Sequence, residues 1–253
     1  MNDILDLHTH TIASGHAYST LSEMIRAASA KGLTLYGCSD HAPTMPGSTH
    51  NFHFINFKVI PRNIHGVHVI MGSELNILDF DGNVDLPVST LKRLDYTIAS
   101  LHIPCLSPGT KEENTRAYVK VMENPYVTII GHPDDSRFPI DYQVFAKAAK
   151  EHHKLVEVNN TSLTPGSARA GARENYGILL NYCRDYQIPI VLSSDAHFET
   201  DVANHRYAWE LLESLDFPEE LIVNTSVEKL KPYIPVLNDM FGEPAGDSCC
   251  KGE

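Results

Sequence analysis

Histidine is frequent in this chain of 253 residues, and its spacing carries most of the chemical information. The chain has 14 His, compared with 9 Phe and 11 Tyr. His8 and His10 form an H-x-H pair near the start, and Asp195 and His197 repeat that spacing later in the chain. Alternate side chains of an extended segment share one face, so each pair can hold one ion. Imidazole and carboxylate groups together bind Zn, Mn and Fe, so the pattern indicates a metal site.

Seven short apolar runs, rich in Val, Ile, Leu and Tyr, predict buried strands. They span residues 4–7, 33–39, 67–72, 96–101, 127–131, 155–158 and 189–192. Segments with helical periodicity separate most of them, at residues 20–32, 112–123, 141–153, 173–186 and 202–215. Residues 51–64 and 78–94 contain Gly, Pro and Asp, and could be loops or short helices. Strand alternating with helix predicts an α/β fold with a parallel sheet, and about seven such units favour a barrel-like single domain.

Each predicted strand leads into a polar side chain. In a parallel barrel the carboxyl ends of the strands meet on one face, so we expect these side chains to share one pocket. His16 lies in a loop just beyond the first pair and could fold over the same pocket. The predicted metal ligands are His8, His10, His16, His41, Glu74, His102, His132, Asp195 and His197. The other seven His, including His205, are expected at the surface or in loops.

The size of this ligand set predicts more than one ion. One four-coordinate ion would leave most of the ligands unused, so two or three ions are expected. Glu74 is the only Glu at the end of a predicted strand, which suits a bridging carboxylate. Ions about 4 Å apart stabilise the attacking and leaving oxygens of a displacement and lower the pKa of bound water. This chemistry is hydrolysis, most naturally of a phosphoester.

Charge and cysteine usage narrow the partners and the compartment. With 20 Lys and Arg against 32 Asp and Glu, the net charge is −12, which disfavours extended nucleic acid and anionic membranes. The 5 Cys have no paired spacing, and the start has no leader signature, so we expect a cytoplasmic protein. No apolar run approaches the roughly 18 residues of a membrane span. Residues 1–240 are predicted to form the domain, and the small, polar residues 241–253 to be disordered.

The order of these motifs resembles the PHP (polymerase and histidinol phosphatase) family. H-x-H is followed by Asp-His after the second predicted strand, by a lone Glu, by two lone His and by a late Asp-x-His. Residues 6–11, 19–21, 53–56 and 193–197 are similar to stand-alone bacterial phosphatases of the YcdX type. The resemblance covers residues 3 to about 231.

The resemblance implies a distorted (β/α)7 TIM-like barrel and a trinuclear site, usually described as zinc. Mn2+ and Fe stay open, because imidazole–carboxylate sites also accept them. Carried over by position, the ligand sets are His8, His10, Asp195 and bridging Glu74 for the first ion, Glu74, His102 and His132 for the second, and His16, His41 and His197 for the third. The resemblance also implies small phosphomonoester substrates and a homotrimer.

For the mechanism, we expect a hydroxide that bridges the first two ions to attack phosphorus. Glu74 and Asp195 are predicted as catalytic ligands, and Asp40 as a catalytic-site residue that orients a ligand His. Asp6 is a weaker candidate for such a role. A phosphate pocket usually adds a guanidinium or ammonium group, and Arg62 is the first choice, ahead of Arg137, Arg169 and Arg173.

Other functions stay open from the sequence alone. An amidohydrolase-like enzyme would cleave C–N bonds, but such barrels typically use a carboxylated Lys or a bridging carboxylate, and no predicted strand ends in Lys. A nuclease acting on nucleotide ends is a variant of the phosphoesterase. A non-catalytic metal-binding or docking module is the third alternative.

Overall fold

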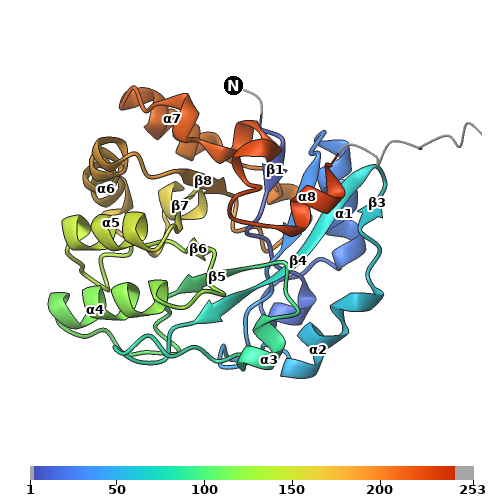
Figure 1. Cartoon of the computed structure of the whole chain (residues 1–253), viewed down its shortest axis with the longest axis horizontal. Helices are drawn as coiled ribbons and strands as arrows, with labels where there is room; N and C mark the ends of the chain where they lie inside the picture. Colours follow the sequence, from blue (N-terminus) through green and yellow to red (C-terminus); the bar gives the residue numbers. More distant parts are fainter. Residues whose placement is uncertain (1–2, 243–253) are drawn as a thin grey trace, which may run out of the picture.

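Seven parallel strands curve into a nearly closed barrel in the computed structural model, which describes residues 3–242 (Figure 1). In sheet order they are β1 (Leu5–Asp6), β2 (Leu35–Cys38), β4 (Val67–Asn76), β5 (Tyr96–Ser100), β6 (Ile129–Ile130), β7 (Leu155–Asn159) and β8 (Ile190–Ser193). The first and last strands approach each other through a parallel bridge between Thr9 and Ala196. Asn224 adds side-chain hydrogen bonds to the backbone of Leu192 and Leu5. The predicted single α/β domain with a barrel is confirmed.

Helices cover the outer face of the strands (Figure 1). The α-helices are α1 (Leu21–Ala30), α2 (Asn51–Ile55), α3 (Val88–Leu91), α4 (Lys111–Met122), α5 (Tyr142–Glu151), α6 (Ala172–Tyr186), α7 (Arg206–Ser214) and α8 (Val236–Met240). The 3-10 turns are η1 (Ile12–Ser14), η2 (Asn56–Val59), η3 (Thr161–Leu163), η4 (Glu199–Asp201), η5 (Glu219–Leu221), η6 (Val223–Thr225) and η7 (Val227–Lys229). Thr20 and Glu23 form a capping box at the start of α1.

Two segments that the sequence left open contain short elements. Residues 51–64 form α2, η2 and the edge strand β3 (Asn63–Ile64), which pairs antiparallel with β4 and was not predicted. Residues 78–94 contain only α3. The prediction that a helix starts at residue 202 is wrong, because α7 begins at Arg206 after the buried side chain of His205.

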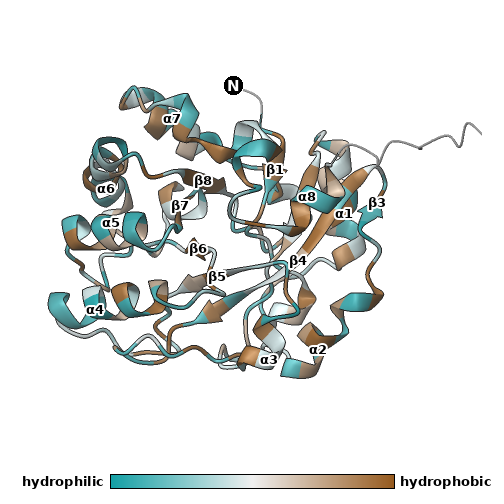
Figure 2. Ribbon diagram, in the orientation of Figure 1, coloured by the Kyte–Doolittle hydropathy of each residue, from teal (hydrophilic) through white to brown (hydrophobic). Residues whose placement is uncertain are grey.

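Side chains alternate between the barrel interior and the helical layer. The interior cluster takes Leu5, Ile70, Tyr96 and other strand residues, and it contains no residue of α1 to α7. Apolar residues of η6, η7 and α8 join this cluster and cover the amino ends of the strands. Figure 2 shows hydrophobic strands inside and hydrophilic surfaces on the outer helices. Burial on both faces explains why the strands read as continuous apolar runs.

The inward row of β4 changes character towards its carboxyl end. Ile70 belongs to the interior cluster, and two strand positions further on Gly72 accommodates the ring of Tyr96. A Cβ at Gly72 would lie 2.6 Å from a ring carbon of Tyr96, so only glycine fits there. Glu74 and Asn76 follow on the same face, because strand side chains alternate. The amino end of β4 therefore contributes to the apolar interior of the barrel, and its carboxyl end contributes to a polar site.

The described residues include no helix that is both long and apolar enough to cross a membrane.

Near the end of the described residues, the ring of Phe241 packs against His68, with centroids 4.2 Å apart. Of the segment predicted to be disordered, residues 243–253 lie outside the part of the chain that the structure describes.

Candidate metal centre

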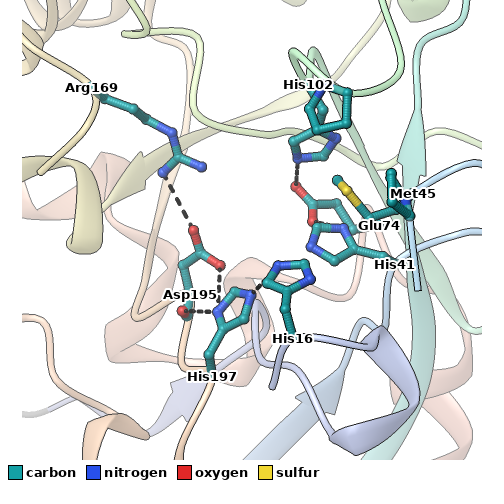
Figure 3. A pocket seen from close by; sticks show the side chains of 10 residues that line it. His16, His41, Met45, Glu74, His102, Arg169, Asp195 and His197 are labelled. Carbon is teal, nitrogen blue, oxygen red and sulfur yellow. Dashed lines mark hydrogen bonds and ion pairs between the residues drawn. The ribbon is translucent and has the colours of Figure 1, made fainter. Parts of the chain in front are cut away.

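A cavity of about 410 Å³ opens at the carboxyl ends of the barrel strands (Figure 3). Its walls come from widely separated parts of the sequence: His16, His41, Met45, Pro46, Glu74, His102, Pro104, Arg169, Asp195 and His197. The expected meeting of polar side chains on one face of the barrel is therefore seen in the structure.

Glu74 lies at the centre of the imidazole cluster. Its Oε2 is 2.8 Å from His41 Nδ1 and 3.3 Å from His8 Nε2, and its Oε1 is 3.0 Å from His132 Nε2 and 3.2 Å from His102 Nε2. Burial alone would raise the pKa of Glu74, but the surrounding imidazoles, His102 first, lower it well below its usual value. His10 Nε2 is a fifth neighbour, 3.6 Å from Oε2, so Glu74 is an ionised carboxylate surrounded by five imidazole rings.

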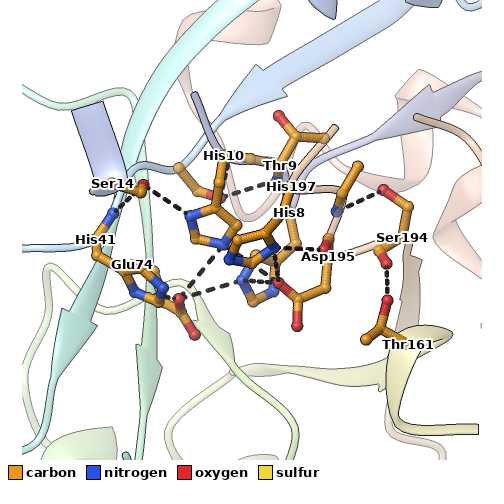
Figure 4. A network of polar contacts seen from close by, with 12 residues as sticks. His8, Thr9, His10, Ser14, His41, Glu74, Thr161, Ser194, Asp195 and His197 are labelled. Carbon is orange, nitrogen blue, oxygen red and sulfur yellow. Dashed lines mark hydrogen bonds and ion pairs between the residues drawn. The ribbon is translucent and has the colours of Figure 1, made fainter. Parts of the chain in front are cut away.

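Asp195 is the second carboxylate of the cluster (Figure 4). Its Oδ1 lies 3.3 Å from His10 Nε2 and 3.6 Å from His8 Nε2. Burial would raise the pKa of Asp195, but electrostatic attraction to His8, a hydrogen bond from His10 and the charge of Arg169 hold it well below the usual range. At the exposed rim, His197 Nε2 lies 3.1 Å from His16 Nε2.

The outer nitrogens of several rings are already engaged by the protein. His8 Nδ1 lies 2.6 Å from Glu157 Oε1, His10 Nδ1 lies 3.0 Å from Ser14 Oγ, and His102 Nδ1 lies 2.8 Å from Asn76 Oδ1. A carboxylate and an amide oxygen can only accept, so the Nδ1 groups of His8 and His102 donate. This tautomer leaves an Nε2 lone pair facing the centre, the usual arrangement of metal-ligating histidines.

The residues present fit a site for divalent ions. His8 Nε2, His10 Nε2, His41 Nδ1 and Glu74 Oε2 are buried and have no hydrogen-bond partner among the described residues. A buried polar atom without a partner is costly, and cations bound at this site would satisfy these atoms. Three groups have ligand atoms within 4.8 Å of one another: His8, His10 and Glu74; His41, Glu74 and His102; and His10, His41 and His197.

These groups agree with part of the ligand sets that the resemblance implies. His8, His10 and Glu74 fall together as expected, with Asp195 beside them. His41 differs, because it groups with Glu74 and His102 or with His10 and His197, whereas His16 is in none of the three groups.

The sequence of this chain is similar to those of several known proteins. The model of the PHP domain matches residues 6–164. The chain is 46% identical over 234 residues to a "Probable phosphatase" of Clostridium novyi, covering 92% of this chain and 95% of that protein. It is 44% identical over 234 residues to a "Probable phosphatase" of Acetivibrio thermocellus, covering 92% and 96%. The chain belongs to the PHP family. Its relatives confirm the predicted enzyme class, a phosphatase.

Solved structures support the PHP fold. A histidinol phosphate phosphatase from Lactococcus lactis, complexed with Zn, L-histidinol and phosphate, matches with a TM-score of 0.57 at 18% identity. The match covers 85% of this chain and 95% of that one. An archaeal ribonuclease P structure with mature tRNA matches with a TM-score of 0.58 at 16% identity, covering 94% and 93%. At such identities the likeness concerns the fold alone.

Glu157 is a residue of this PHP protein that the sequence analysis missed. It contacts His8, and its Oε2 accepts from the His132 backbone N–H at 2.7 Å. Burial would raise the pKa of Glu157, but His8 lowers it, so the group stays charged. The available signal was an acidic residue within an apolar run that a parallel sheet buries on both faces.

Asp40 lies behind the residues that line the cavity and is held there by hydrogen bonds. It accepts from the Thr11 backbone N–H at 2.7 Å and from Ser14 Oγ at 2.8 Å, and Ser14 contacts His10. Burial would raise its pKa, but hydrogen bonds from His53, Thr11 and Ser14 lower it to about 2. Asp40 is thus a positioning residue that reaches His10 through Ser14, and it does not line the cavity.

The prediction that Arg62 contacts substrate is not supported by its position. Arg62 forms two hydrogen bonds with Asp95, of 2.6 and 3.2 Å, at the amino end of β5 and thus away from the cavity. Arg169 lines the cavity instead and lies 3.3 Å from Asp195 Oδ2 and 3.1 Å from Ser162 Oγ. Burial would lower the pKa of Arg169, but Asp195 and other acidic groups raise it, so it stays charged.

Asp6 supports the loop that carries Asp195 rather than a ligand His. Its carboxylate accepts from Ser194 Oγ and from the Ala203 backbone N–H at 2.8 Å. His205, expected at the surface, is buried beside it, with Nε2 3.5 Å from Asp6 Oδ1. Asp195 itself has a φ of 55°, which is uncommon for a residue other than glycine. Asp6 therefore helps to fix an unusual backbone turn.

Proposed function

We propose that this phosphatase hydrolyses small phosphomonoesters at a site that holds three divalent ions, Zn2+ in the first place and Mn2+ or Fe as alternatives. The observation that carries the proposal is the set of buried, unpartnered nitrogen and oxygen donors around Glu74. Zn is bound in the histidinol phosphate phosphatase that shares the fold. Imidazole and carboxylate donors suit all three metals.

The ligand sets proposed for the three ions follow the family pattern. His8, His10, Asp195 and Glu74 would hold the first, Glu74, His102 and His132 the second, and His16, His41 and His197 the third. When bound, such ions supply Lewis-acid stabilisation of phosphoryl oxygens and lower the pKa of water. The first two sets share Glu74, whose two oxygens face different imidazoles.

Arg169 is the chain's own group for the substrate phosphate. Its guanidinium lines the cavity and is held by Asp195, Ser162 and Asn159, so its position is fixed before a substrate arrives. A fixed guanidinium binds a phosphoryl oxygen through charge-assisted hydrogen bonds. We assign Arg169 this role in place of Arg62.

The alternatives receive less support. The described residues that line the cavity include no Lys, which an amidohydrolase with a carboxylated Lys would require. Arg169 is the only Arg or Lys of that lining, and the net charge is −12, which disfavours a long nucleic-acid substrate. A small phosphorylated partner therefore fits best. The homotrimer implied by the resemblance stays a prediction for light scattering.

The decisive experiment measures metal content and turnover on the same sample. The protein is purified without chelator, analysed for transition metals, and assayed with p-nitrophenyl phosphate before and after stripping. We expect three ions per chain, loss of activity on stripping and recovery with Zn2+ or Mn2+. Ions bound without turnover of any phosphoester would contradict the phosphatase proposal, and one ion or none would contradict the ligand sets.

A further inference from the structure

The cavity has two unlike walls. Arg169 lies on one side, next to Asp195, whereas Met45 lies on the other, beside Glu74 and His102 (Figure 3). Pro46, next to Met45 in the chain, and Pro104, two residues after His102, also line the cavity. A phosphate placed on the central ligands would therefore have a cation on one side and a hydrocarbon surface on the other.

The apolar wall is built on the same backbone as the ligands. The Ala42 N–H, next to His41, donates to the Glu74 carbonyl at 2.9 Å, and the Met45 N–H donates to the Ala42 carbonyl at 3.2 Å. After β5, the Cys105 N–H donates to the His102 carbonyl at 2.9 Å, and this hydrogen bond closes the turn that contains Pro104. These backbone hydrogen bonds fix the position of the apolar wall relative to the candidate ligands.

Met45 is not accounted for by core packing. It is only 7% exposed, yet it belongs to neither of the two clusters of buried apolar residues. Its neighbour Pro46 and the more distant Pro104 are exposed at the cavity. A thioether and two saturated pyrrolidine rings offer an apolar surface against which a flat apolar group can pack. The cavity, at about 410 Å³, lies at the small end of ligand pockets.

The charges of the lining indicate that only one anionic group of the substrate is accommodated. Glu74 and Asp195 face the metal ligands, and Arg169 is the only Arg or Lys among the described lining residues. A second phosphate or a carboxylate on the leaving group would therefore meet Met45 and prolines instead of a cation. The net charge of −12 also repels a substrate that carries a second negative group.

We propose that Met45, Pro46 and Pro104 form the leaving-group subsite, and that it takes a compact, uncharged alcohol or phenol with a flat apolar face. This inference rests on the proposed phosphatase function. It names the class of ester that this site hydrolyses best, and it excludes bisphosphates and other esters with an anionic leaving group as good substrates.

Three alkyl esters test the class. Benzyl phosphate and glycerol 1-phosphate both release an alcohol, and 4-carboxybenzyl phosphate adds one negative charge to the benzyl ring. We expect kcat/KM for benzyl phosphate to exceed that for glycerol 1-phosphate roughly tenfold, because the ring is removed from water. The carboxylate should remove most of that advantage. Equal kcat/KM values for all three would overturn the subsite while the phosphatase proposal stands, whereas no turnover of any ester by the metal-loaded protein would contradict the phosphatase proposal itself.

A charge placed on the wall gives a second test. In Pro104→Lys, the ratio of kcat/KM for 4-carboxybenzyl phosphate to that for benzyl phosphate should rise roughly threefold to fivefold, as for a partly exposed ion pair. Pro108→Lys is the matched control, since Pro108 is exposed in the same loop and does not line the cavity. Similar ratios in the two variants would refute the assignment of Pro104, even where metal content and glycerol 1-phosphate turnover are normal.

Discussion

Two buried clusters of imidazole and carboxylate groups lie close together in this protein and differ in how they balance charge. In the metal centre, seven imidazoles gather around Glu74 and Asp195. In the second cluster, the single ring of His205 lies between Asp3 and Asp6. Asp6 and His8, a proposed ligand of the metal centre, are only two residues apart in the chain.

The second cluster is balanced by the protein itself. His205 Nδ1 lies 3.0 Å from Asp3 Oδ2, which also accepts from the Trp209 indole, and Asp6 accepts from Ser194 and Ala203. Burial alone would lower the pKa of His205, but Asp6 and Asp3 raise it to about 9. A protonated His205 thus neutralises part of the acidic charge without any ion.

The metal centre cannot be balanced in the same way. Protons on several adjacent imidazoles would repel one another: His197 and His41 lower the pKa of His10, which burial already lowers, well below its usual value. Ring nitrogens of several histidines and one Glu74 oxygen stay without a hydrogen-bond partner there, whereas in the second cluster the one such ring nitrogen, His205 Nε2, still faces the Asp6 carboxylate at 3.5 Å. The comparison teaches that burial of a histidine does not identify a ligand, whereas a large excess of imidazoles over carboxylates does.

Removing the central charge should have the largest effect on catalysis. In Glu74→Gln the side chain keeps its shape but loses the carboxylate that five imidazoles surround. We expect phosphatase activity to fall on the order of 10³-fold or more and the metal content to drop, because the bridging charge is lost. Elemental analysis and kcat/KM check this, with circular dichroism to show that the fold is kept. A variant with full metal content and activity within tenfold of the wild type would contradict the central role of Glu74.

An intermediate effect is expected from Glu157→Gln. The amide can still accept from the His132 N–H, but it no longer offers His8 a charged acceptor. Loss of such an outer partner typically costs 10- to 100-fold in metal affinity or activity. Zn2+ titration of the stripped protein should show weaker binding, and saturating Zn2+ should restore part of the activity. Glu112→Gln, an exposed position in α4, is the matched control. Unchanged Zn2+ affinity would show that Glu157 has no part in orienting His8.

The sequence predicted which side chains gather around Glu74 more completely than it predicted their surroundings. Strand-end position alone brings His8, His41, His102 and His132 together, because parallel topology carries all strand ends to one face. The same reasoning applies to Glu74, although β4 continues beyond it to Asn76. Glu74 still lies at the carboxyl end of the strand, and its side chain is on the inward face.

The errors concern residues whose position depends on loop paths or on long-range partners. Arg62 and Arg169 both follow segments without clear periodicity, and only the folded loops decide which one reaches the cavity. His205 was expected at the surface, because its partner Asp3 is about two hundred residues away in the chain. Pairing across such separations leaves no local pattern to detect.

The balanced cluster should matter for stability more than for catalysis. His205→Gln removes the cation between Asp3 and Asp6 and leaves a buried carboxylate, that of Asp6, and a half-buried one, that of Asp3, without it. Breaking a buried ion pair costs on the order of 3 kcal/mol of unfolding free energy. Metal content and kcat/KM should change less than tenfold, since His205 touches no ligand. Urea unfolding of this variant and of the control His152→Gln checks the difference, and loss of bound metal in His205→Gln would break the separation between the two clusters.

The smallest effect is a pH dependence that belongs to the balanced cluster alone. The folded pKa of His205, about 9, is raised above its ordinary 6.5, so its contribution to stability is fully present below pH 6.5 and is lost as the pH rises through 9. That contribution is on the order of 3 kcal/mol at most. The unfolding free energy of the wild type should therefore fall between pH 6.5 and 9, and His205→Gln should show a flatter profile over the same range. Parallel profiles would mean that His205 is neutral in the folded protein. Asp3 and Asp6 would then have no cation between them, and the contrast in charge balance between the two clusters would be wrong.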